Sequence, residues 1–277
     1  MFTNSLKKAY LQNQDKNLLV IRNCIKETIQ FYVLDFVYKS PWGGSLIMKG
    51  GTCLRLCFDL PRLSEDLDFD LENFAKFSLS NFVIALDNYF KKTLQYKNIN
   101  IKIAGNNRTI YLKFPILTDL GMRVGKSESN IVIVRLDLAP IVGKSYQTEV
   151  SIKSTLNFSL LIKRYSLPCL FAGKLSAILT REAWEGKIKK ERFKGRDYFD
   201  LIWFMEKGVK PNWNYLAEIT GLTQKQVLAK LEQKTQAVTK KMLKDDLLPF
   251  FQDQQFINQF VENFQALYQS YKSVLSK

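Results

Sequence analysis

The chain has 277 residues, of which 46% are hydrophobic and 13% aromatic, so it can bury a core in one large domain or two modest ones. It contains no histidine, which excludes an imidazole base and zinc sites that use histidine. Its 41 lysines and arginines exceed its 26 acidic residues, for a formal net charge of +15. That excess favours a polyanionic partner such as nucleic acid, although solvated lysines alone would produce it too.

Targeting segments are not evident in the sequence. No apolar run is long enough to cross a bilayer, and the first residues lack the apolar core of a signal peptide. The four cysteines form no CxxC pair and are expected to be free, buried thiols. We therefore expect a cytoplasmic protein without membrane association.

The first part of the chain predicts alternating helices and strands. Apolar residues at helical spacing indicate a helix at 13–39, which Pro41 and two glycines end. The next expected elements are a strand at 45–49, a Gly-Gly turn, a helix at 52–58, a strand at 66–71 and a helix at 79–96. Further strands are expected at 99–104, 108–114, 130–139, 148–155 and 159–165.

The composition becomes helical from Pro168 onward. One helix is expected from Pro168 to about 180–184, another from Gly195 to 207, and helical periodicity continues through 213–276. The expected fold is therefore α/β (α+β) with a mixed sheet in residues 1–165, followed by an all-helical domain in residues 166–277.

Two aspartates in the strand at 66–71 are the first candidates for catalytic residues. Asp66 and Asp68 are two residues apart, so their carboxylates project from the same face of the sheet. Two adjacent acids repel each other unless a cation bridges them, and their hard oxygen atoms suit Mg²⁺ or Mn²⁺. Asp70 shares this face, either as a third ligand or as a solvated neighbour.

A further carboxylate belongs to the strand at 130–139. In this strand alternate residues are apolar, whereas Arg135 and Asp137 share the opposite face. An acid in so apolar a strand is unfavourable unless it lies at a site or pairs with a base, such as Arg135 or Lys153. If this strand neighbours the one at 66–71, the carboxylates of Asp66, Asp68 and Asp137 converge.

The order of these motifs resembles a known family. Gly51-Thr52, thirteen residues and Asp66-x-Asp68 resemble the Gly-Ser…Asp-x-Asp signature of polymerase-β-like nucleotidyltransferases. A fuller pattern consists of Lys49-Gly-Gly-Thr-x-x-Arg55 followed by Arg62-x-Ser64-x-Asp66-x-Asp68. This pattern resembles the narrower AbiEii/AbiGii group, which includes MenT-type toxins of type IV toxin–antitoxin systems. The resemblance implies metal binding by Asp66, Asp68 and Asp137. It also implies that the NTP contacts a second set of residues, Lys49, Gly50, Gly51, Thr52, Arg55 and Ser64.

Two motifs in the second half extend the resemblance. Lys174 resembles the lysine that the group carries near the start of a helix, and Arg196-Asp197-x-x-Asp200 resembles its Arg-Asp-x-x-Asp motif. Lys174 is expected to neutralise phosphate charge, and Asp197 to orient that lysine or to activate the acceptor hydroxyl. Asp200 could instead hold Arg196. By themselves these residues would suggest a surface lysine and a helical salt bridge.

A basic stretch lies between these two motifs. Seven basic residues and two aromatic residues fall within 181–196. Such a run is often only an exposed loop, but its position beside the motifs favours contacts with an RNA backbone. The expected RNA-binding residues are Lys187, Lys189, Lys190, Arg192, Lys194 and Arg196.

The motifs and the resemblance together predict a Mg²⁺-dependent nucleotidyltransferase that transfers NMP from an NTP to RNA. The resemblance further implies that the protein is a toxin, with tRNA as the expected acceptor and a cognate antitoxin as a partner. Three alternatives remain open. They are kinase-like transfer of a phosphoryl group, RNA binding without catalysis on a degenerate transferase fold, and modification of a small molecule.

Overall fold

The computed structural model describes residues 2–105, 108–122, 125, 129–185 and 188–276, with the backbone alone described from 182 to 191. The chain divides into two compact units. The first comprises Met1–Ile141 and Val150–Arg164, and the second Val142–Glu149 and Tyr165–Lys277.

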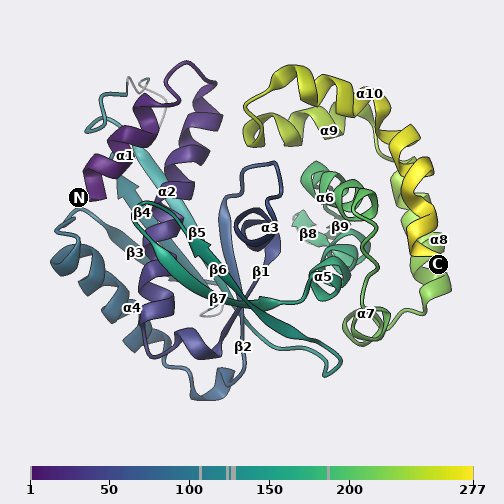
Figure 1. The fold of residues 1–277 in the computed structure, drawn as a ribbon, viewed down its shortest axis with the longest axis horizontal. Coiled ribbons are helices and arrows are strands. Elements are labelled where there is room, and N and C mark those ends of the chain that lie inside the picture. Colours follow the sequence, from purple (N-terminus) through teal and green to yellow (C-terminus); the bar gives the residue numbers. More distant parts are fainter. Residues whose placement is uncertain (1, 106–107, 123–124, 126–128, 186–187, 277) are drawn as a thin grey trace. The chain divides into compact units, whose positions relative to one another are not determined.

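A seven-stranded mixed sheet is the framework of the first unit (Figure 1). Its strands follow the order β3-β4-β5-β2-β1-β7-β6. Strands β2 and β5 run parallel, as do β1 and β7, whereas β1–β2, β3–β4 and β4–β5 are antiparallel. The strands are β1 (Leu46–Lys49), β2 (Asp66–Leu71), β3 (Asn100–Ala104), β4 (Thr109–Pro115), β5 (Ile131–Pro140), β6 (Thr148–Ser154) and β7 (Ser159–Tyr165). The mixed sheet expected from the sequence is confirmed.

One face of this sheet forms the core of the unit. Leu67 and Phe69 of β2 are fully buried and lie beside Leu136 and Leu138 of β5. Strand β5 contacts α2, and Phe2 packs edge-on against aromatic rings of α2 and of the turn after α4. The helices of the unit are α1 (Phe2–Leu11), α2 (Leu18–Lys39), α3 (Gly50–Phe58) and α4 (Leu79–Asn88). Because the helices bury the apolar face, the polar side chains of β2 and β5 belong to the other face.

The helix bounds differ in places from those expected. Helix α2 begins at Leu18 rather than at 13, because the side chain of Asn17 caps it by accepting a hydrogen bond from the Leu19 N–H at 2.8 Å. The amphipathic pattern at 79–96 contains α4 and then a π-helical turn, Tyr89–Thr93. Helix α1 was not expected, because it buries only Phe2 and Leu6.

The second unit is mostly helical. Its helices are α5 (Leu167–Thr180), α6 (Gly195–Glu206), α7 (Trp213–Thr220), α8 (Gln224–Gln236), α9 (Lys240–Leu247) and α10 (Gln254–Tyr271). Stacked rings of Phe171 and Phe204, with centroids 4.4 Å apart, join α5 to α6. None of the helices that the structure describes is long and apolar enough to cross a membrane.

A β-hairpin corrects the expectation that residues 166–277 are all helical. Strands β8 (Glu182–Glu185) and β9 (Ile188–Glu191) pair antiparallel, with Glu182 opposite Glu191. These strands are four residues long and mostly charged, so they carry no apolar alternation that could have indicated them.

Candidate functional site

Strands β2 and β5 bring the predicted carboxylates together. Their parallel register places Asp68 beside Asp137 and Asp66 beside Arg135. Paired residues of neighbouring strands point to the same side of a sheet, so all four side chains share the face opposite the apolar core. Asp66 and Asp68 are both partly exposed. Strands β2 and β5 are therefore adjacent in the sheet, which is the condition under which the three carboxylates were expected to converge.

Asp137 is held by two neighbouring side chains. The Thr109 hydroxyl, directly opposite in β4, donates to Asp137 Oδ1 at 2.6 Å, and Arg135 Nη2 lies 2.5 Å from Asp137 Oδ2. Burial by itself would lower the pKa of Arg135. The hydrogen bond and charge of Asp137, together with the charge of Asp66, outweigh burial and raise that pKa. Of the two pairings considered for Asp137, the structure contains the one with Arg135.

Asp70 lies on the same face but in different surroundings. Its side chain is only 4% exposed and forms an ion pair with Lys49, whose Nζ lies 2.6 Å from Asp70 Oδ1. Asp70 is therefore not a solvated neighbour of Asp68. Lys49, which we expected to contact the nucleotide, is directed to this buried carboxylate, and its side chain remains 38% exposed.

The Gly-Gly turn lies against Asp68. Gly50 has φ +77°, in the left-handed region that favours glycine, and a Cβ there would lie 2.2 Å from Asp68 Oδ2. A Cβ on Gly51 would lie 2.7 Å from an Arg62 guanidinium nitrogen and 2.9 Å from Ser64 Oγ. Only glycine allows β1 to turn into α3 this close to the acid and to the segment that precedes it.

The other residues expected to bind the nucleotide surround this turn. Thr52 donates its hydroxyl to the Asp66 carbonyl at 2.5 Å, which fixes the start of α3 to the start of β2. Ser64 is buried, and its carbonyl accepts from Gln30 of α2 at 3.1 Å. Arg55 forms an ion pair with Glu27 of α2 and donates to the Leu60 carbonyl at 3.3 Å. These contacts give Thr52 and Arg55 a structural role whatever else they bind.

The sheet face that carries Asp66, Asp68 and Asp137, which we call the acid face, is chemically compatible with a divalent metal. Asp66, Asp68 and Asp137 offer hard oxygen atoms from neighbouring strands, which is the donor type that Mg²⁺ prefers. Among the residues that the structure describes, no three acidic or thiol side chains already form a compact metal-binding cluster. The Asp137 carboxylate would have to exchange its contact with Arg135 for one with the metal.

The second unit holds a separate cluster of charges between α5 and α6. Lys174 Nζ lies 2.8 Å from Asp197 Oδ1 and 2.8 Å from Asp200 Oδ2. Arg181, just after α5, forms an ion pair with the other oxygen of Asp197. The two carboxylates are almost completely buried, and the Lys174 side chain is 11% exposed.

This cluster bears on the two roles considered for Asp197. Its two oxygens contact two cations, so it is placed to orient Lys174. Asp200 contacts the same lysine, and this ion pair was not anticipated. Arg181 was not among the predicted site residues, because its spacing from Asp197 carries no periodic signal.

The basic stretch is described only in part. Lys187 lies outside the described residues, and Lys189 and Lys190 lie on β9, where the backbone alone is described. Arg192 is exposed, whereas Lys194 is half-buried. The Arg196 guanidinium lies 4.6 Å from the centroid of the Phe250 ring, and the Arg196 N–H donates to Asp246 at 2.9 Å.

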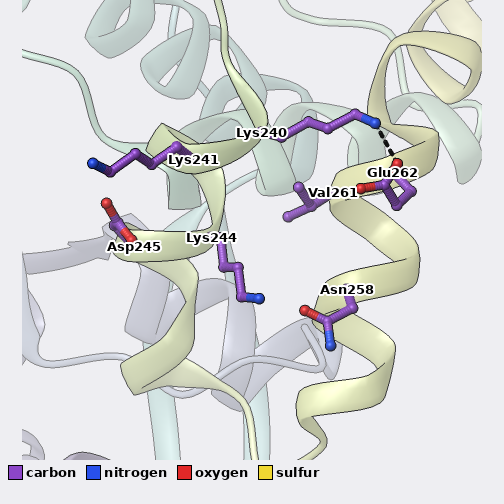
Figure 2. Close-up of a pocket in the computed structure, with 7 residues that line it drawn as sticks. All are labelled: Lys240, Lys241, Lys244, Asp245, Asn258, Val261 and Glu262. Atoms are coloured by element: carbon purple, nitrogen blue, oxygen red, sulfur yellow. Dashed lines mark hydrogen bonds and ion pairs between the residues drawn. The ribbon is translucent and has the colours of Figure 1, made fainter.

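A hollow of about 340 Å³ lies between α9 and α10 of the same unit (Figure 2). Its charged lining consists of three lysines and two acids, and one of the lysines, Lys240, forms an ion pair with Glu262. Because the positive and negative charges nearly balance, the hollow has no marked preference for an anion.

The model of the family described as "Nucleotidyl transferase AbiEii toxin, Type IV TA system" matches residues 34–275. No curated protein sequence matches the chain.

Two solved structures share the fold. MenT4, a nucleotidyltransferase toxin from Mycobacterium tuberculosis H37Rv, superposes with a TM-score of 0.58 at 13% identity, over 99% of this chain and 92% of that one. JHP933 from Helicobacter pylori gives a TM-score of 0.50 at 16% identity, over 92% of this chain and 93% of that one. At such low identity these similarities concern the fold.

Proposed function

The chain belongs to the AbiEii family of nucleotidyl transferase toxins of type IV toxin–antitoxin systems, and from this premise we propose that it transfers a nucleotidyl group from an NTP to an RNA acceptor, with tRNA as the expected substrate. The observation that carries the proposal is the register of β2 and β5, which sets Asp68 beside Asp137 on one face with Asp66 next to them. Transfer of NMP joins the acceptor oxygen to the α-phosphorus and releases pyrophosphate.

We propose that Asp66, Asp68 and Asp137 hold Mg²⁺, or Mn²⁺, during the reaction. When bound, the metal would neutralise phosphate charge and favour deprotonation of the acceptor hydroxyl. Without the metal, Arg135 balances the negative charge of Asp137 and Asp66. When the metal binds, Arg135 would release Asp137 to it. Thr109 keeps the Asp137 carboxylate oriented through its hydrogen bond.

We propose that the triphosphate binds at the turn between β1 and α3. The first N–H groups of a helix have no partner within the helix and attract anions, and α3 begins at Gly50, directly beside Asp68. Ser64, whose hydroxyl lies next to Gly51, and Thr52 are further candidates for phosphate contacts. Lys49 could reach the nucleotide by leaving Asp70.

Lys174 and Asp197 keep the roles that the family motifs imply. Lys174 supplies a positive charge to the phosphates, and Asp197, with Asp200, holds the ammonium group in position. The basic residues near β9 and the start of α6 are proposed to contact the RNA backbone, and Arg192 is the one that the structure describes as exposed. Membership of a toxin–antitoxin family implies a cognate antitoxin.

The decisive experiment incubates the protein with Mg²⁺, total tRNA and each of the four NTPs labelled at the α-phosphate. We expect label in the RNA and release of pyrophosphate. The double variant Asp66→Asn plus Asp68→Asn is expected to lose at least about a thousandfold in rate, because the metal loses two of its ligands. A matched control, Asp15→Asn plus Asp59→Asn, changes two well-exposed aspartates and should remain active.

The same assay, repeated with γ-labelled NTPs and accompanied by measurements of RNA binding and of growth, separates the alternatives. Label transferred only from a γ-labelled NTP, with nucleoside diphosphate as the second product, would establish phosphoryl transfer instead. If the double variant bound RNA and arrested growth like the wild type, the protein would act by binding alone. Equal labelling by the wild type and the double variant would refute the role of these aspartates. A small-molecule acceptor is indicated if labelling does not depend on RNA.

A further inference from the structure

Strand β6 is an edge strand of the seven-stranded sheet (Figure 1). It exposes apolar side chains. Val150 and Ile152 are 62% and 77% exposed, and Leu161 of the neighbouring β7 is 64% exposed. Open edges with apolar side chains tend to pair with another strand, and proteins usually protect them. Among the strands that the structure describes, β6 has a neighbour on one side only, so its other side is a candidate interface.

The hydrogen bonds to β7 determine which backbone groups of β6 point outward. Thr155 N–H donates to the Phe158 carbonyl at 2.7 Å, and Ser166 N–H donates to the Gln147 carbonyl at 2.8 Å. In an antiparallel pair, residues that bond to the neighbour alternate with residues that do not. Odd-numbered residues of β6 therefore bond toward β7, whereas Thr148, Val150, Ile152 and Ser154 direct their N–H and C=O groups to the open edge.

The hairpin that carries this edge is firmly anchored. The Phe158 ring at its turn contacts the rings of Phe31 and Tyr32 on α2, with centroids 5.8 Å and 4.8 Å away. On β6 itself, Ser151 accepts a hydrogen bond from Arg164 of β7 at 2.7 Å. The edge is thus presented in a fixed conformation, which lowers the entropy lost when it binds a partner.

The sequence of β6, Thr-Glu-Val-Ser-Ile-Lys-Ser, is complementary to itself. In an antiparallel pair of two copies centred on Ser151, Glu149 lies opposite Lys153 and Val150 opposite Ile152 in both halves. The outward-pointing residues then face each other, so their backbone groups can hydrogen-bond. Shifting the centre by one or two residues in either direction removes both the charge pair and the Val–Ile pair.

We propose that two copies of this chain associate through antiparallel pairing of their β6 strands about a two-fold axis at Ser151. The axis is perpendicular to the sheet, so the exposed apolar residues of both copies lie on one face and form a single patch. Opposite charges and β-branched residues facing each other across strands each stabilise the pairing. A contact of one strand per copy is smaller than the ~1,200–2,000 Å² of a typical stable interface, so the dimer is weak, with a dissociation constant on the order of 10–100 µM.

Sedimentation velocity over about 1–300 µM, a range that spans this dissociation constant, tests the proposal. We expect the wild type to shift, as its concentration rises, from 32.2 kDa toward a species of twice that mass. Each single variant, Glu149→Lys or Lys153→Glu, sets like charges opposite each other at two symmetric positions and is expected to weaken association about tenfold or more. The double variant Glu149→Lys plus Lys153→Glu restores opposite charges and should regain the wild-type behaviour.

The control variants distinguish this strand pairing from nonspecific hydrophobic association and from misfolding. Leu156→Lys removes the most exposed apolar side chain, at 97%, from the hairpin turn outside the paired strand, and should associate like the wild type. The Lys153→Glu and double variants lose the same contact with Asp59, so recovery in the double variant must come from the partner. A wild type that stays monomeric at 300 µM, or a double variant that behaves like the single ones, would overturn the proposal.

Discussion

The acid face of the sheet and the charge cluster of the second unit both pair basic with acidic side chains, but they differ in solvent exposure. The second group, the Lys174 cluster, consists of Lys174, Arg181, Asp197 and Asp200. On the acid face, Arg135 and Asp137 are 40% and 25% exposed. In the Lys174 cluster, the carboxylates of Asp197 and Asp200 are 6% and 0% exposed. Ion pairs in water are weak and easily exchanged, whereas buried pairs are costly to separate.

This difference in exposure fits two different roles in the reaction. A site that binds metal and triphosphate must let its carboxylates change partners, and the exposed contact between Arg135 and Asp137 allows that at low cost. A lysine that supplies one fixed positive charge benefits from confinement, because little reorganisation is then needed during the reaction. The comparison can be tested by removing one cation from each group.

The larger effect is expected in the buried cluster. Lys174→Met keeps the volume of the side chain but leaves Asp197 and Asp200 without their shared cation. We expect the free energy of unfolding to fall by about 3–5 kcal/mol and the Tm by about 10 °C. Urea and thermal unfolding followed by circular dichroism measure this.

A compensating variant shows whether uncompensated charge is the cause. In Lys174→Met plus Asp200→Leu, one buried charge of each sign is replaced by an apolar group, and Asp197 keeps its ion pair with Arg181. Much of the lost stability should return, since apolar replacements of buried ion pairs are often neutral or stabilising. If the double variant were less stable than Lys174→Met, packing rather than charge would dominate.

The smaller effect is expected on the acid face. Arg135→Met removes the cation beside Asp137, but both side chains are partly exposed and water can solvate the carboxylate. We expect a change of less than about 1 kcal/mol in the free energy of unfolding. Nucleotidyl transfer should respond more strongly, and its Mg²⁺ dependence should change because Asp137 loses its competing partner. A stability loss as large as that of Lys174→Met would contradict the comparison.

The sequence predicted well those features that depend on local patterns. The alternation of apolar and polar residues in the strand expected at 130–139 placed Asp137 on the correct face, and the spacing of Asp66 and Asp68 placed both on one face. The Gly-Gly turn was recognised from composition, and the structure adds why glycine is needed there, namely the closeness of Asp68 and Arg62.

Features that depend on long-range pairing were less predictable. Strand order is determined by contacts distant in sequence, so the hydrogen bond of Thr109 to Asp137, across 28 residues, had no local signal. The burial of Asp70 and its pairing with Lys49 depend on the register of β1 and β2. The β8–β9 hairpin was missed because charged residues dominate it. The self-complementarity of β6 matters only because β6 lies at an edge of the sheet.

The smallest effect concerns a third kind of carboxylate, which is held by hydrogen bonds at the surface. Glu218 of α7 accepts from the N–H groups of Ser145 and Lys144 and from the Ser145 hydroxyl, and these bonds lower its pKa. Because the pKa of Glu218 is lower in the folded protein than in the unfolded chain, its charged form stabilises the fold at pH values above about 4.3, the ordinary pKa of glutamate. This contribution is lost as the pH falls through the pKa of the folded state. Glu218→Gln should therefore melt below the wild type at pH 7, with a difference that shrinks between about pH 5 and 3. A difference equal at every pH would show that the charge of Glu218 has no part in it.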